Sequence, residues 1–344
     1  MTPLRWFLTA LSFVTAFAVS LYVVVHSWPP GAGVGALALP LGAHALALAV
    51  ALAEVGARGV KLALSARSLR VPMTLRTAMR ACLGGDFGAA VTPARSGSEP
   101  ARFLILAEAG TPAAGTVLVL FAELVLEMLS LLIVAGALLA LFPAAASAVR
   151  GLAGLVSAYA VVVLGTGAVG VTLARGHGPG PPPRWLRMLG VRGDRWRAVQ
   201  RALRQLRASA GAVRAAPKGM LLLALVVSVA HVAARLLVLP VLVLALAPAV
   251  RLAPLVVWPL ALQYGAAVAP APGGGGLVEV AFRAVLGPAI PAFALGAALV
   301  WWRVYTFYLY VPLGALAAGR TVMRALRARP AAVDDTPEVL PSSA

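Results

Sequence analysis

The chain places the polar stretch TPARSGSEPARF, residues 92–103, between two long apolar segments. This stretch holds two arginines, a glutamate, a glycine and two prolines, which are residues that interrupt an apolar helix. A second stretch, APAPGGGGLVEVAFR at residues 269–283, has the same order of features: a proline- and glycine-rich break, a glutamate and then an arginine. The fold depends on how these two interruptions are accommodated.

The composition of the 344-residue chain is typical of a membrane protein. Hydrophobic residues make up 61% of it and charged residues 12%, whereas a soluble domain is about one quarter charged. Apolar runs of about 20 residues recur, which is the length that an α-helix needs to cross the hydrocarbon core of a bilayer. Strand-type alternation is absent from the sequence, which argues against a β-barrel. We therefore expect an all-α polytopic membrane protein.

The charge balance is strongly basic, with 29 Lys and Arg against 11 Asp and Glu and a formal net charge of +18. Nucleic-acid binding is a poor explanation, because the basic residues lie in blocks beside apolar segments, where the positive-inside rule and anionic lipid headgroups account for them. These blocks predict a multi-pass protein of the cell inner (plasma) membrane with both termini in the cytoplasm. Cys82 is the single cysteine in the sequence, so no disulfide framework is expected.

The apolar runs predict six spanning helices, at residues 6–27, 36–57, 113–141, 151–174, 219–247 and 292–318. Three basic blocks are expected on the cytoplasmic side: Arg58, Lys61, Arg67, Arg70, Arg76 and Arg80; residues 175–218; and Arg320, Arg324, Arg327 and Arg329. The first apolar run is too long for a signal peptide, so we expect it to remain as a membrane helix. Residues 1–329 then form one transmembrane domain, and the tail at 330–344 is expected to be disordered.

Two segments lie between the predicted spans, at residues 72–110 and 254–290. Each begins and ends on the same side of the membrane, so neither can cross once. Their arms, at 81–91 and 277–286, are too short to span a bilayer, which favours two re-entrant hairpins entering from opposite faces. Opposed, similar units are typical of inverted-repeat transporters, although abundant Ala, Gly and Pro can produce the same likeness by composition alone. If the two segments are an inverted repeat, the polar tips of the hairpins line a cavity.

Several charged residues fall within predicted membrane segments, where each needs a partner or a purpose. They are Arg235, with His231 one turn earlier; Arg303; and Glu123 with Glu127, whose like charges repel unless a cation intervenes or one is protonated. One reading pairs Glu123 or Glu127 with Arg235 or Arg303 to hold helices together. The other places Arg95, Arg235 and Arg303 around a phosphate, aided by the amino end of the half-helix after Gly276. Glu123 or Glu127 is then the candidate proton site.

The remaining polar residues carry weaker signals. His44 and Glu54 are read as polar contacts between helices. His26 and His177 form no ligand set with the other histidines, so neither a metal nor a cofactor is expected, and the absence of a nucleotide loop or a catalytic triad argues against an enzyme. In the loop at 175–218, Arg197, Arg201 and Arg204 share one helical face, which suits an interfacial helix or a solvated basic helix equally well.

Three sets of residues carry a resemblance to a known family. These are RSLRVPMTLRTAMRACLGGDFGAAVTPARSGSEPARFLILAEAG; AELVLEMLSLL; and VAPAPGGGGLVEVAFRAVLG with WWRVYTFYLYVPLG. Together they resemble the flippase-like transmembrane family that includes the membrane half of lysylphosphatidylglycerol synthase. The matching positions are Pro93, Gly97, Glu99, Arg102, Glu123, Pro272, Gly273, Gly274, Gly276, Glu279, Arg303 and Tyr305.

This sequence departs from the family pattern at Ser96 and Ser98, where glycines are expected, and at Leu124, where an arginine is expected. The resemblance implies movement of lipids or lipid-linked precursors between leaflets. It does not imply aminoacyl transfer, because no transferase domain follows Arg329 in this sequence.

We therefore expect a flippase-like transporter for a phospholipid or a lipid-linked, phosphate-bearing precursor, with membrane lipids as its surroundings. The alternative is a non-transporting scaffold that binds a lipid-modifying enzyme or glycosyltransferase through the basic loop. The expected substrate-binding residues are Arg95, Glu99, Arg102, Glu123, Glu127, His231, Arg235, Gly273, Gly274, Gly276, Glu279, Arg303 and Tyr305.

Overall fold

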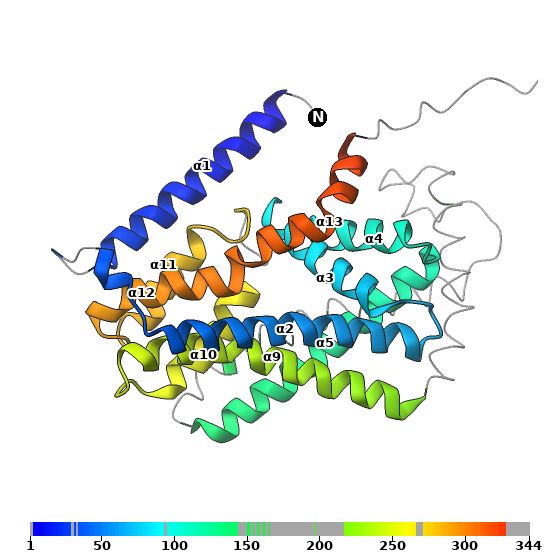
Figure 1. Cartoon of the computed structure of the whole chain (residues 1–344). Helices are drawn as coiled ribbons and strands as arrows, with labels where there is room; N and C mark the ends of the chain where they lie inside the picture. Colours follow the sequence, from blue (N-terminus) through cyan, green and yellow to red (C-terminus); the bar gives the residue numbers. More distant parts are fainter. Residues whose placement is uncertain are drawn as a thin grey trace, which may run out of the picture.

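A computed structural model describes residues 3–28, 31, 34–92, 95–143, 217–265 and 271–327, with a few isolated positions between 150 and 196. Within these ranges the regular structure is helical throughout (Figure 1). The elements are α1 (Pro3–His26), η1 (Val34–Leu37), α2 (Leu41–Ser68), α3 (Leu75–Ala90), α4 (Ser98–Glu108), α5 (Ala113–Leu141), α9 (Lys218–Leu246), α10 (Leu252–Gly265), α11 (Leu277–Leu286), α12 (Ala292–Arg303), the π-helical segment η4 (Val304–Tyr308) and α13 (Tyr310–Arg327).

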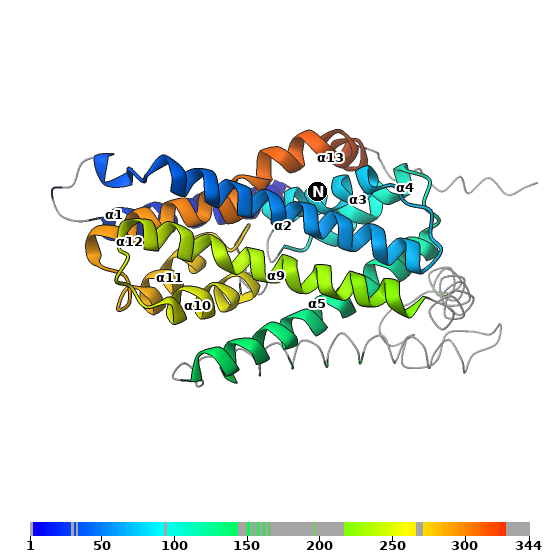
Figure 2. The same cartoon turned by 60° about the horizontal axis from the view of Figure 1, so that its bottom comes forward.

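The centre of the molecule is the antiparallel pair α2 and α9, which lie side by side along most of their length (Figures 1 and 2). α2 turns small side chains toward this contact, including the buried Ala47 and Ala51, so that the two helices approach closely. In a membrane, small residues at helix contacts allow the dense packing that replaces the hydrophobic effect. α5 packs along α9 on the side away from α12 (Figure 2).

Two short helix pairs lie at opposite ends of this central pair (Figure 1). At one end, α3 and α4 pack against each other and against α13. At the other, α10 and α11 pack together, and α11 also contacts α1 and α12. Each pair encloses one of the polar breaks that the sequence singled out. The loops that join the pairs point toward the middle of the molecule, where their described residues meet.

In the described part of the chain, three helical stretches are long and apolar enough to cross a membrane: Ala113–Leu141, Lys218–Leu246 and Ala292–Thr321. They coincide with the spans predicted at 113–141, 219–247 and 292–318, which confirms a multi-pass membrane protein. The predicted span at 151–174 contains only isolated described positions. The loop at 175–218 and the tail at 330–344 lie almost wholly outside the described residues, as do Pro93 and Pro270.

The second span differs from its prediction. α2 continues through Ser68 instead of ending at residue 57, so Arg58 and Lys61 lie within the helix rather than in a cytoplasmic loop. Both are buried, with Lys61 only 1% exposed. The positive-inside rule misplaced them because it counts charge along the chain, whereas these two cations are neutralised by acidic side chains on other helices.

Glycines allow α13 to approach α3 closely. A Cβ atom at Gly314 would lie 2.3 Å from the carbonyl oxygen of Leu83, and one at Gly84 would lie 2.6 Å from the Cβ of Ala318. The first neighbour is backbone and cannot move aside. The contact between the first helix pair and the last helix therefore depends on the missing side chains.

The substitution Gly314→Ala is expected to lower the thermal unfolding midpoint of the detergent-solubilised protein, since overpacking costs about 1–3 kcal/mol. Gly136→Ala in α5 is the matched control, because a Cβ there meets nothing within 4 Å. Both substitutions gain the same helix propensity, so the difference between their unfolding midpoints measures the effect of the steric clash at Gly314. Equal midpoints for the two variants would show that this contact is not tight.

Candidate functional site

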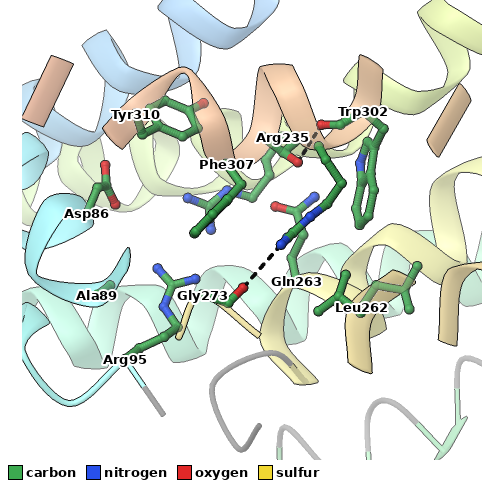
Figure 3. A pocket seen from close by; sticks show the side chains of 13 residues that line it. Asp86, Ala89, Arg95, Arg235, Leu262, Gln263, Gly273, Trp302, Phe307 and Tyr310 are labelled. Atoms are coloured by element: carbon green, nitrogen blue, oxygen red, sulfur yellow. Dashed lines mark hydrogen bonds between the residues drawn. The ribbon is translucent and has the colours of Figure 1, made fainter. Parts of the chain in front are cut away.

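A small cavity of about 40 Å³ lies where the two helix pairs meet (Figure 3). The first pair contributes Asp86 from α3 and Arg95 from the loop before α4. The second contributes Gln263 from α10 and Gly273 from the loop before α11. Arg235 of α9 and several residues between Trp302 and Tyr310 also line it, together with the apolar side chains of Ala89, Leu262 and Val278. Sequence segments nearly 200 residues apart thus share one polar cavity of a size that holds several water molecules.

Unusual backbone brings the two loops together. Arg95 has a φ of 56°, a left-handed conformation that is uncommon for a residue with a side chain. Gly273 and Gly276 have φ values of 59° and 80°. A Cβ at Gly273 would also lie 2.1 Å from Cζ of Phe307, so this position needs glycine for both reasons. Strained positions of this kind cluster at functional sites.

The π-helical segment faces the glycine-rich loop. It follows Arg303 directly and holds Phe307, whose ring centre lies 4.5 Å from the guanidinium carbon of Arg303. Single π turns inside α-helices are frequent at functional sites, because the extra residue re-aims the side chains that follow. Here Phe307, within the turn, lies against Gly273, and Arg303, just before the turn, donates to the carbonyl oxygen of Gly273.

Arg303 and Glu279 form a buried pair. The Nε atom of Arg303 lies 2.8 Å from Oε1 of Glu279, although its N–H does not point at that oxygen, and Nη2 donates weakly to the carbonyl of Gly273 at 3.4 Å. Glu279 is 1% exposed and Arg303 6%. One of the two readings of the sequence paired Arg303 or Arg235 with Glu123 or Glu127, and that pairing is wrong, because Arg303 lies beside Glu279 and Arg235 beside Glu54.

Arg235 pairs with Glu54, which the sequence treated only as a minor polar contact. Its Nε and Nη2 atoms donate to Oε1 of Glu54 at 3.1 and 2.7 Å. Tyr310 donates to Oε2 of the same carboxylate at 3.0 Å. Arg58 lies 3.0 Å from Oε1 and makes a two-bond contact with Asp86 at 2.8 and 2.7 Å. This chain of pairs joins α9, α2, α3 and α13.

Lys61 lies between the two glutamates that share a face of α5. Its Nζ is 2.5 Å from Glu127 and 3.3 Å from Glu123, so it is the cation that removes their repulsion. Glu127 also accepts a hydrogen bond from Tyr264 at 2.5 Å, and Glu123 pairs with Arg102. Glu123 and Glu127 therefore belong to this second network and do not line the cavity.

The structure brings only some of the predicted residues together. Arg95, Arg235, Gly273 and Arg303 line the cavity. The other predicted residues lie around it: Glu99 is exposed and pairs with Arg102, Tyr305 contacts His44 at 2.9 Å, and the amide of Gly276 donates to Ser20. Asp86 and Gln263 were missed. Asp86, a charge within the apolar arm GGDF, carried a signal that could have identified it.

Two donors at the cavity have no acceptor among the described residues. They are Nε2 of Gln263 and Nε1 of Trp302. Arg95 also has no carboxylate within ion-pair distance in the described part of the chain, and its side chain points into the cavity (Figure 3). Convergent donors and an unpaired guanidinium fit a ligand rich in acceptor oxygens, such as phosphate. No cluster of His, Cys, Asp and Glu that suits a metal ion is found among the described residues.

The substitution Lys61→Met is expected to destabilise the protein by about 3–5 kcal/mol, because it leaves the buried carboxylate of Glu123 and the partly buried carboxylate of Glu127 without the cation between them. The double change Lys61→Met with Glu127→Gln should recover part of this loss. Thermal unfolding in detergent measures both, and Lys218→Met at the exposed start of α9 is the control. If Lys61→Met alone were as stable as Lys218→Met, the role given to Lys61 would be contradicted.

Comparison with individually curated proteins finds no match to the chain. Comparison with family models does find one: the model described as the lysylphosphatidylglycerol synthase TM region matches residues 7–314, which include every cavity-lining residue. This match agrees with the glycine-rich breaks and buried charged pairs described above, and it indicates a membrane protein related to lipid modification or transport. The chain belongs to the lysylphosphatidylglycerol synthase transmembrane-region family.

Proposed function

We propose that this protein is a flippase-like transporter that moves a phospholipid or a lipid-linked, phosphate-bearing precursor between the leaflets of the plasma membrane. The headgroup would pass through the cavity between the two helix pairs, while the acyl or prenyl tails stay in lipid. In this proposal the protein transports its lipid without chemical change, and both termini face the cytoplasm.

The observation that carries the proposal is the set of arginines around the cavity. Arg95, Arg235 and Arg303 come from three separate elements and converge on one space. Arg235 and Arg303 are each balanced by a glutamate, but Arg95 has no such partner among the described residues. A phosphate in the cavity would satisfy Arg95 with two parallel hydrogen bonds and would give acceptors to Gln263 and Trp302.

The arrangement of the helix pairs supports a path across the membrane. The pairs α3–α4 and α10–α11 lie at opposite ends of the long helices α2 and α9, and their loops meet at the cavity. We propose that they are re-entrant hairpins entering from opposite faces, so that the cavity lies near the bilayer midplane. Irregular backbone at that depth is tolerated where it lines a cavity, and inverted-repeat transporters bind their substrates in this position.

The size of the cavity implies that the described state is closed. A space that holds several waters is smaller than a lipid headgroup, so transport requires the hairpin loops to separate. The glycine-rich loop at 273–276 and the π segment at Val304–Tyr308 are the elements suited to this change, because both depart from regular backbone. Movement of either would widen the cavity toward one face.

The substitution Arg95→Gln is expected to slow lipid exchange at least about tenfold, since a hydrogen bond to a charged group contributes about 1.5–3 kcal/mol. The assay uses proteoliposomes with fluorescently headgroup-labelled phosphatidylglycerol or polyprenyl phosphate, and follows how fast label in the inner leaflet becomes accessible to an impermeant quencher. Arg251→Gln is the matched control, because Arg251 is an exposed arginine that does not line the cavity.

Two outcomes would count against the proposal. Exchange by Arg95→Gln at the rate of the unmodified protein would remove the phosphate role of the cavity. Exchange no faster than in empty liposomes, with every lipid and with an imposed ion gradient, would favour the scaffold function that depends on the loop at 175–218. A measured unfolding midpoint for each variant separates a transport defect from a folding defect.

A further inference from the structure

His231 lies next to the cavity but does not line it. It occupies α9 one turn before Arg235 and is 1% exposed. A buried histidine is usually held in one tautomer, because a neutral imidazole has one nitrogen that donates and one that accepts. The surroundings of this ring allow neither neutral form to be satisfied.

Each ring nitrogen lies near oxygen atoms that act only as hydrogen-bond acceptors. These are a backbone carbonyl oxygen and the oxygens of two ionised carboxylates. Nδ1 lies 3.3 Å from the carbonyl oxygen of Ser228 and 3.7 Å from Oε2 of Glu127. Nε2 lies 3.4 Å from Oε1 of Glu54 and has no hydrogen-bond partner among the described residues. In either neutral tautomer, the nitrogen that carries no proton therefore lies within 3.4 Å of an acceptor oxygen. A second proton on the ring removes this conflict, because the imidazolium donates at both nitrogens.

We propose that His231, with Glu54 beside it, is a proton-binding site whose occupancy is coupled to anion binding in the cavity. This inference rests on the proposed transport function and names how that function would be driven. Water would supply the proton to Nε2, and it would return to water when the anion leaves. The candidate proton sites read from the sequence, Glu123 and Glu127, are less suitable because Lys61 pairs with both.

The coupling passes through one carboxylate oxygen. Oε1 of Glu54 already accepts two hydrogen bonds from Arg235, which matches its two lone pairs. A proton on Nε2 of His231 competes for the same oxygen. The competition frees a donor of Arg235, which lines the cavity, so the protonated state offers an additional hydrogen bond to an anion.

Charge balance favours the same coupling. The two ion-pair networks on either side of His231 hold four carboxylates, Glu54, Asp86, Glu123 and Glu127, and four cations, Arg58, Lys61, Arg102 and Arg235. These eight charges cancel while His231 is neutral; the exposed Glu99, which also pairs with Arg102, is outside this count. A proton on His231 adds one positive charge, and an anion in the adjoining cavity offsets it, so each ligand raises the affinity for the other.

The groups around His231 oppose one another. Burial and nearby cations disfavour the imidazolium, whereas the two carboxylates favour it. The charged and titratable groups that surround the ring are Glu54 and Lys61 of α2, Glu127 of α5, Arg235 of α9, Tyr264 of α10 and Tyr310 of α13.

The first test measures the protonation of the His231 ring directly. The chain has four histidines, so histidine-selective isotope labelling of the full protein in nanodiscs gives few NMR signals, and His231→Gln assigns the relevant one. We expect that signal to titrate, with a midpoint that rises by at least about half a pH unit when dihexanoyl phosphatidylglycerol is added, because each bound ligand raises the affinity for the other. A ring that keeps one protonation state from pH 5 to 9, or a midpoint unmoved by bound lipid, would overturn the proposal.

The second test measures exchange of labelled phosphatidylglycerol in proteoliposomes at equal internal and external pH, from 6 to 8. Lipid exchange by the unmodified protein should be at least about fivefold faster at pH 6 than at pH 8, and His231→Gln should lose this pH dependence. His26→Gln is the control, because His26 lies at the exposed end of α1. A pH dependence that persists in His231→Gln would contradict the coupling. Absence of exchange at every pH would refute the transport function, while the NMR titration would still decide the proton site.

Discussion

The carboxylate of Glu54 holds the centre of this molecule together. It is 1% exposed among apolar helices, where an unpaired charge would cost about 2.5–3.5 kcal/mol on membrane-insertion scales. Arg58, Arg235 and Tyr310 therefore converge on it from its own helix, from α9 and from α13. Because each partner comes from a different part of the chain, this one group fixes the register of the central helices and the positions of the residues around the cavity.

The charge network also explains why the cavity can bind an anion without collapsing. Every buried carboxylate described in the network is matched by a cation, so the arginines stay in place when the site is unliganded. Among the described arginines that line the cavity, Arg95 alone has no carboxylate as an ion-pair partner, and its left-handed backbone holds it at the cavity. A site that is almost balanced, with one extra guanidinium, suits a ligand that must enter and leave, since excessive attraction would trap it.

Most of the architecture could be predicted from residue patterns. The spans at 113–141, 219–247 and 292–318 agree with the helices because long apolar runs have one stable state in a bilayer. The half-helix at 277–286 was predicted at its observed bounds, Leu277–Leu286, because glycine and proline mark its start. Arg95, Arg235, Gly273 and Arg303 could be selected for the cavity, since polar residues inside apolar segments are few. Asp86 was missed although it is a charge within an apolar arm, whereas Gln263 could not be selected, because nothing local distinguishes it from residues that serve packing.

The sequence by itself determined that this chain is a helical membrane protein, where its polar breaks lie, and which family it resembles, because these properties depend on local composition and motif spacing. Only the tertiary structure decided the partners of the buried charges. Arg303 pairs with Glu279, Arg235 with Glu54, and Lys61 with Glu123 and Glu127. The physical reason is that a charge inside a helix bundle pairs with the nearest opposite charge in space, and that distance is set by helix packing rather than by separation along the chain.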